Sequence, residues 1–279
     1  MDTKQTKSRS TSISWKRLTT ILITLYLGAL ALLIYFERSL LFPAPSIQFG
    51  NWQASQFGAE ESYVDNSGVQ IHVWSLAKKD ATKTLIVCHG NGETLGLMGE
   101  ELNAIRDRWN VNVVAFDFRG YGKTGGQPNE IDILSDSIAV AKWIQENRML
   151  QEQKFIALGR SLGGASAIEI ATRTKVDGLI LDRTFSSIVD VAASRYFFFP
   201  VRWLMRNQFR SIEKIPNYTG PLLQMHGDVD VVVPYRFGKE LHEASPSKPK
   251  EFISVKGLHH NDPWPESFWI AGKRFLEQL

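Results

Sequence analysis

The sequence of 279 residues predicts an α/β domain whose sheet is mostly parallel and carries helices on both faces. Through most of the chain, short apolar runs typical of buried strands alternate with longer helix-compatible stretches. An antiparallel pair precedes this alternation, since residues 62–76 contain two strand-like runs joined at Asn66, Ser67 and Gly68. A serine flanked by glycines, Ser161, separates one such run from one such helix.

The individual elements follow from this alternation. After the hairpin, strands are predicted at residues 84–88, 111–116, 155–158, 178–181, 222–225 and 252–255. Helices are predicted at residues 95–108, 131–147, 161–173 and 265–279. Because a helix separates most consecutive strands, neighbouring strands are expected to run parallel.

Composition excludes some function classes. The net charge is +3, and much of the excess lies in the first 17 residues, so the folded part has no basic stripe for nucleic acid. The single cysteine, Cys88, rules out an intrachain disulfide. A chain without a disulfide fits a cytosolic protein, and it does not exclude an exported one.

Residues 18–36 carry no charge and match the roughly 20 residues that span a bilayer. They follow a basic stretch that contains Lys4, Lys7, Arg9, Lys16 and Arg17. The positive-inside rule therefore predicts a cytoplasmic segment 1–17, an uncleaved anchor 18–36 and a linker 37–61. A catalytic domain, 62–279, would lie on the non-cytoplasmic side, which is the periplasm if the source is bacterial. A cleaved signal peptide is the alternative, because Ala29-Leu30-Ala31 resembles a cleavage site.

Residues 159–163 form the pattern G-x-S-x-G between a predicted strand and a predicted helix. In that context the serine sits on a sharp turn that flanking glycines permit sterically. Its hydroxyl is then held at the N-terminus of a helix, where free N–H groups favour negative charge. Ser161 is therefore the candidate nucleophile.

A serine nucleophile needs a base, an acid and oxyanion donors. The loop after strand 222–225 offers two acids, Asp228 and Asp230, and the loop after the last strand offers two histidines, His259 and His260. Spacing alone does not choose within either pair. The backbone N–H groups of Leu162 and Asn91, the latter in a His-Gly-Asn-Gly loop after strand 84–88, are the predicted oxyanion donors.

The segment between residues 181 and 222 interrupts the alternation, and a short cap is predicted at about 186–220. It is rich in aromatic residues interspersed with four arginines, and Phe197, Phe198 and Trp203 are its candidate substrate-pocket residues. An ordinary amphipathic helix and loop packed over the sheet would also explain the pattern. The sharper interpretation is a cap that binds an apolar acyl group or touches the membrane surface.

Five motifs in order give the chain a family resemblance: HGNG at 89–92, DFRGYGKT at 117–124, GRSLGG at 159–164, HGDVDVVVP at 226–234 and HND at 260–262. From about residue 62 onward the sequence resembles the membrane-anchored branch of the α/β-hydrolase serine hydrolases, which implies the α/β-hydrolase fold. The resemblance also implies that Asp230 is the acid and His260 the base. His259 replaces a residue that is often small in relatives. Asp117 and Arg119 are implied to be structural.

The implied function is a serine hydrolase that cleaves carboxylic esters or thioesters of lipid-like or acylated substrates. The first alternative is a peptidase or amidase of the same fold, and the second is a catalytically idle, membrane-tethered binding protein. No cofactor is implied. His259, His260 and Asp262 do not have the spacing of a recognised metal site. The expected partners are a small-molecule or acylated substrate and a membrane, with no nucleic acid.

Overall fold

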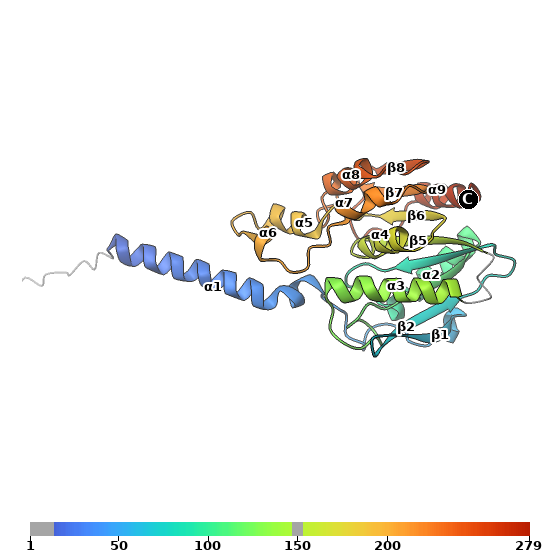
Figure 1. Cartoon of the computed structure of the whole chain (residues 1–279), viewed down its shortest axis with the longest axis horizontal. Coiled ribbons are helices and arrows are strands. Elements are labelled where there is room, and N and C mark those ends of the chain that lie inside the picture. The colour runs from blue at the N-terminus through green and yellow to red at the C-terminus, as the bar shows by residue number, and fades with distance from the viewer. Residues whose placement is uncertain (1–13, 147–152) are drawn as a thin grey trace, which may run out of the picture.

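The computed structural model describes residues 14–146 and 153–279 of the chain (Figure 1). An eight-stranded sheet in the order β1-β2-β4-β3-β5-β6-β7-β8 organises these residues. Its strands are β1 Glu60–Asn66, β2 Val69–Leu76, β3 Lys83–Cys88, β4 Asn112–Phe116, β5 Lys154–Arg160, β6 Gly178–Asp182, β7 Leu222–Gly227 and β8 Lys250–Val255. β2 pairs antiparallel with β1 and β4, and all pairs from β4 to β8 are parallel. The predicted fold class is confirmed.

Helices cover both faces of the sheet. On one face α3 (Glu130–Glu146), α4 (Gly163–Arg173) and α8 (Tyr235–Ala244) bury their apolar sides. On the other face lie α2 (Leu95–Trp109), α9 (Glu266–Glu277) and the short helix η1 (Ala54–Phe57). Residue 147, which the sequence placed at the end of the α3 helix, falls outside the described residues, as does most of segment 1–17.

The central strands are apolar on both sides because both faces of the sheet are covered. In β3, Ile86 and Cys88 belong to the core under α3 and α4, whereas Leu85 and Val87 belong to the core under α2 and α9. This alternation is the period of two expected of a strand. It explains why the parallel strands appear in the sequence as continuous apolar runs.

The predicted hairpin is present. Asn66 pairs with Val69, which leaves the two-residue turn Ser67 and Gly68. Both turn residues have positive φ, at 55° and 80°. That combination belongs to the turn whose twist matches the two strands.

The cap segment contains four short helices, α5 (Ile188–Arg195), α6 (Val201–Leu204), α7 (Ser211–Lys214) and η2 (Ile215–Asn217). α5 and α6 project from the domain alongside the C-terminal half of α1 (Figure 1). All four helices belong to the excursion of the chain between β6 and β7.

Helix α1 (Trp15–Leu41) is the only helix in the described part of the chain that is long and apolar enough to cross a membrane. It projects from the domain, has a mean hydropathy of 2.1 in its most apolar window and buries none of its residues (Figure 1). By length and composition a signal sequence would also fit. The helix is longer than the predicted 18–36 and includes the first five residues of the predicted linker, 37–41. The chain after it is packed onto the domain, because Phe42, Ala54 and Phe57 are buried.

Candidate active site

The structure places Ser161 on the tight turn between β5 and α4. Its φ of 50° lies in the left-handed region, which costs a non-glycine residue roughly 1–3 kcal/mol. Hydrogen bonds to the neighbouring strand end hold this conformation. The Ser161 N–H donates to the carbonyl of Asp182 at 2.9 Å, and the Thr184 hydroxyl donates to the carbonyl of Ser161 at 2.7 Å.

The glycines of the motif are required by close backbone approach. A Cβ on Gly163 would overlap the carbonyl oxygen of Cys88 at the end of β3. A Cβ on Gly159 would overlap the carbonyl oxygen of Gly163 across the turn. Glycines at these two positions of the G-x-S-x-G motif therefore allow helix α4 to start in direct contact with β3 and β5.

Ser161, His260 and Asp230 meet at the carboxyl ends of β5, β8 and β7, the positions at which parallel strands deliver their loops. The Nε2 atom of His260 lies 3.0 Å from the Ser161 hydroxyl oxygen. Its Nδ1 atom lies 2.7 Å from Oδ2 of Asp230. Serine, imidazole and carboxylate therefore form one continuous hydrogen-bonded line. Sequence spacing had left two acids and two histidines open.

The two alternatives have other positions. Asp228 accepts a hydrogen bond from the Gly257 N–H at 2.7 Å, so it ties the loop after β7 to the loop that carries the histidines. His259 is exposed, and its N–H donates to Asp262 at 2.7 Å. Among the described residues, neither forms a hydrogen bond with Ser161.

The Asp230 carboxylate is buried and receives several hydrogen bonds. Burial by itself raises its pKa, but hydrogen bonds from His226 and His260 and from the Val233 N–H outweigh burial and hold the pKa well below its usual range. Val232 N–H donates to the same Oδ1 atom at 2.8 Å. The carboxylate therefore stays charged and fixed beside His260.

This depressed pKa predicts a loss of stability in acid. In the unfolded chain Asp230 takes up a proton near its ordinary pKa of about 3.9, whereas in the folded state it does so only at lower pH. Its contribution is therefore complete above about pH 5 and declines as the pH falls below that value. Thermal unfolding followed by circular dichroism from pH 7 to pH 3 should show a shallower acid decline for Asp230→Asn than for the native protein. An equal decline of stability with falling pH in both proteins would contradict the lowered pKa of Asp230.

The predicted oxyanion donors lie beside the serine. Asn91 lines the same cavity as Ser161, and Leu162 follows the serine directly. Within residues 14–146 and 153–279, neither backbone N–H has a hydrogen-bond partner, so both are free to donate. The Asn91 side chain is engaged on both sides. It donates to the carbonyl of Leu41 and accepts from the Tyr121 hydroxyl, each at 2.5 Å.

A cavity of about 630 Å³ opens at Ser161 and His260. Its volume is in the range of small-molecule sites. The wall combines aromatic rings with charged side chains, namely Glu93, Glu101, Arg160, Arg183, Asp262, Trp264 and Trp269. Sequence reasoning did not place these residues at the substrate cavity, although it had weighed Asp262 as a metal ligand. Arg160, inside the serine motif, could have been singled out, but nothing local distinguishes the two tryptophans.

The cap aromatics are not at this cavity. Phe197, Phe198 and Trp203 are 71%, 72% and 89% exposed and are absent from its wall. They lie on the side of the cap near α1, where Phe199 stacks on Tyr26. The interpretation that they form the substrate pocket is not supported by their position, because the β6–β7 excursion carries them away from the serine.

Asp117 and Arg119 have local partners. Asp117 accepts from the Leu95 N–H at 2.8 Å and faces His72 at 2.9 Å, and Arg119 pairs with Asp136 at 2.7 Å. No group of three His, Cys, Asp or Glu side chains in the described ranges is arranged to hold a metal ion.

Comparison with known proteins finds a family model, related sequences and solved structures. Residues 79–210 match the family model described as "Serine aminopeptidase, S33". Over 185 residues the chain is 30% identical to alpha/beta hydrolase domain-containing protein 17B of Homo sapiens, a match covering 66% of the chain and 62% of that protein. The chain has the α/β-hydrolase fold. An uncharacterised protein of Mycobacterium tuberculosis is 31% identical over 179 residues, which are 64% of this chain and 63% of that protein.

Solved α/β-hydrolases share the fold. An esterase from Pyrococcus furiosus superposes with a TM-score of 0.70 at 19% identity, covering 84% of this chain and 96% of its own. Est1E from Butyrivibrio proteoclasticus, solved with ferulic acid bound, superposes with a TM-score of 0.65 at 20% identity, covering 77% and 98%. The sequence matches span less than two thirds of the curated relatives' length. The family model also ends before Asp230 and His260.

Proposed function

We propose that this α/β-hydrolase is a serine hydrolase that cleaves carboxylic esters or thioesters. The observation that carries the proposal is the line from Ser161 Oγ through the His260 ring to Asp230, with contacts of 3.0 and 2.7 Å. Such a line is the arrangement in which a serine hydroxyl gains a base and the base gains an orienting acid.

In the proposed mechanism His260 Nε2 takes the proton of Ser161 as Oγ attacks the carbonyl carbon. Asp230 accepts the hydrogen bond from Nδ1–H, so it fixes the tautomer that leaves Nε2 free and stabilises the imidazolium that forms. His260 then donates its proton to the leaving alcohol or thiol, and an acyl-enzyme remains. A water deprotonated by His260 hydrolyses it and regenerates Ser161.

The N–H groups of Asn91 and Leu162 would bind the oxyanion. One such donor is worth about 3 kcal/mol in comparable enzymes. The N-terminus of α4 adds a favourable partial charge at the same place. The side-chain bonds of Asn91 to Tyr121 and Leu41 would hold the first donor in position.

We also propose that α1 anchors the domain to a membrane, with the N-terminus in the cytoplasm and the domain on the opposite side. This favours lipid-like or acylated substrates, because one residue of the active-site cavity contacts the end of α1. Asn91, in the cavity wall, bonds the carbonyl of Leu41, the last residue of α1. A substrate held in the adjacent leaflet would have a short path to Ser161.

Amide hydrolysis is the second candidate, since the matching family model is described as a serine aminopeptidase. The same triad can attack an amide, so the choice depends on turnover. Purified full-length protein in detergent should be assayed on an ester, a thioester and an anilide of the same acyl group, and on aminoacyl anilides. Ester and thioester turnover above anilide turnover supports the proposal. The reverse order would assign a peptidase.

The two aspartates provide the internal control of this assay. Asp230→Asn is expected to lower kcat about 10⁴-fold, because the amide favours the wrong histidine tautomer. Asp228→Asn, two residues away, should keep turnover near the native level because Asp228 contacts only the loop backbone. Loss of activity in Asp228→Asn with retention in Asp230→Asn would overturn the assignment of the acid.

A further inference from the structure

The exposed aromatic side chains of the cap follow helix α1 away from the domain. The Tyr26 hydroxyl donates to the carbonyl of Phe198 at 2.9 Å, and the rings of Tyr26 and Phe199 stack at 5.4 Å between centroids. Nearer the domain, one stripe of α1 lines a shared apolar groove with α6, formed by Leu30, Leu33, Ile34, Phe199, Leu204 and Met205. The cap thus contacts α1 over about three helical turns, from Tyr26 to Glu37.

These contacts place the tip of the cap at a defined depth. Tyr26 lies ten residues before Phe36, the end of the uncharged stretch, which is about 15 Å along a helix. The hydrocarbon core of a bilayer is about 30 Å thick. A cap tip bound at Tyr26 would therefore lie near the middle of a membrane spanned by α1.

We propose that residues 196–204 insert into the bilayer leaflet next to the domain, as a short re-entrant segment packed on α1. The partner of the exposed rings is the acyl chains of phospholipids. This inference rests on the proposed anchoring by α1 and extends it to a second membrane element. The three most exposed rings of this segment, Phe197, Phe198 and Trp203, then face lipid. Contact with lipid explains why these large apolar side chains are not buried in the protein.

Several backbone polar groups of this segment have protein partners, which favours its insertion. The N–H groups of Phe199, Val201 and Trp203 donate to carbonyls within the segment. The carbonyl of Phe198 accepts from the Tyr26 hydroxyl. Non-helical backbone at membrane depth is tolerated where protein provides such partners.

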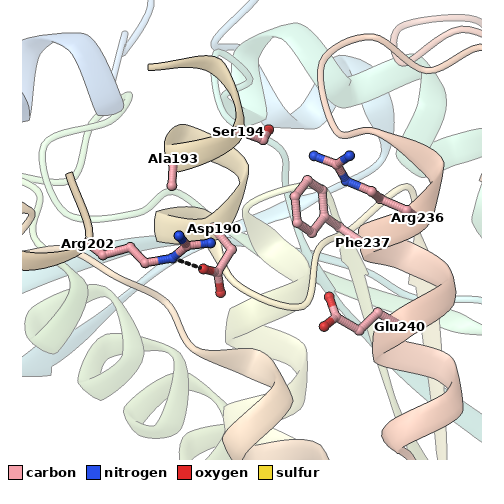
Figure 2. Close-up of a pocket in the computed structure, with 7 residues that line it drawn as sticks. All are labelled: Asp190, Ala193, Ser194, Arg202, Arg236, Phe237 and Glu240. Atoms are coloured by element: carbon pink, nitrogen blue, oxygen red, sulfur yellow. Dashed lines mark hydrogen bonds and ion pairs between the residues drawn. The ribbon is translucent and has the colours of Figure 1, made fainter. Parts of the chain in front are cut away.

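Polar contacts mark where the insertion stops. Glu37, directly after the uncharged stretch, accepts hydrogen bonds from the Arg206 and Asn207 N–H groups at 3.0 and 2.9 Å. α5, α6 and α8 line an open cavity of about 470 Å³, whose wall includes Asp190, Arg236 and Glu240 (Figure 2). Arg202 turns from α6 into it and pairs with Asp190 at 2.8 Å (Figure 2). The cap is therefore amphipathic, with charges at headgroup level and rings beyond them.

Depth-dependent fluorescence quenching tests the insertion. Full-length protein would carry an NBD label on Phe198→Cys or Trp203→Cys, in vesicles of phosphatidylcholine and phosphatidylglycerol with or without nitroxide-labelled acyl chains. The native Cys88 is buried and burial raises its pKa, so it should not react. Leu25→Cys on α1 reports the anchor, and Lys273→Cys on α9 reports the soluble domain. Circular dichroism checks that each variant is folded.

The proposal expects labels at Phe198, Trp203 and Leu25 to lose most of their emission to the lipid quencher, and the label at Lys273 to keep its emission. Quenching at Leu25 without quenching at Phe198 and Trp203 would overturn the insertion and leave the anchor intact. No quenching at any of these sites would overturn both. Hydrolytic activity is measured separately, so neither result depends on the proposed chemistry.

Discussion

Ser161→Ala is expected to abolish labelling by a fluorophosphonate probe and to lower ester turnover by about 10⁴- to 10⁶-fold, the range found when a triad nucleophile is removed. The probe phosphonylates only a serine whose hydroxyl has a base, and His260 Nε2 is the base 3.0 Å away. The measurement is in-gel fluorescence of detergent-solubilised protein, native and variant side by side.

Ser166→Ala is the matched control. Ser166 lies on the same helix, α4, and its buried hydroxyl has no hydrogen-bond partner among the described residues. Its removal should leave labelling intact. Labelling that persists in Ser161→Ala would place the nucleophile elsewhere. A folded native protein that never labels would favour the idle, membrane-tethered binding protein over the hydrolase.

Asp182→Asn is expected to destabilise the protein by about 3–5 kcal/mol, the cost of breaking a buried ion pair on one side. Asp182 is fully buried at the end of β6 and accepts from Arg183, Arg160 and the Trp264 indole at 2.7, 3.1 and 2.6 Å. Burial raises the pKa of this carboxyl, and the two arginines outweigh burial and lower it. Without the charge, the Arg183 guanidinium stays buried with only carbonyl partners.

The change should appear as a fall in Tm of roughly 10 °C, measured by circular dichroism or differential scanning fluorimetry in detergent. Glu251→Gln is the control, since it removes a surface pair with Arg274 whose side chains are both about half exposed. Such a pair is worth about 0–1 kcal/mol, so its Tm should change little. If both variants have the same Tm as the native protein, the buried hydrogen bonds of Asp182 do not stabilise the fold.

The sequence predicted most of the fold because local signals agreed with the final structure. Apolar runs became β3 to β8 within a few residues, and Asn66, Ser67 and Gly68 marked the β1–β2 turn. Helix α1 extended beyond its predicted end at residue 36, because Glu37 and Arg38 find partners on the domain in Asn207 and Gln127. The predicted anchor ended at residue 36 because charged residues follow it. Contacts with the rest of the protein satisfy those charges, so the helix continues past them.

In the candidate site, too, the residues that depend on local sequence were predicted from it, and those that depend on the path of the chain were not. Ser161 was identifiable from its own neighbours, because the turn it occupies needs glycines at fixed positions. The prediction that the aromatic residues of the cap line the substrate pocket was not supported. Composition indicates that an aromatic ring will contact an apolar environment, but it does not identify that environment. Only the path of the chain between β6 and β7 puts Phe197 and Phe198 beside α1 and away from the serine.

The sequence by itself determined the order of elements, the serine turn and the length and charge of the apolar N-terminal helix, because these depend on residues close together in the chain. The tertiary structure decided which acid and which histidine face the serine, since Asp230 and His260 lie 30 residues apart and the serine and the histidine 99. It also decided that Asn91 bonds the end of α1. Contacts over such separations depend on strand order and loop path, so spacing alone could not choose Asp230 and His260, although the family resemblance had implied both.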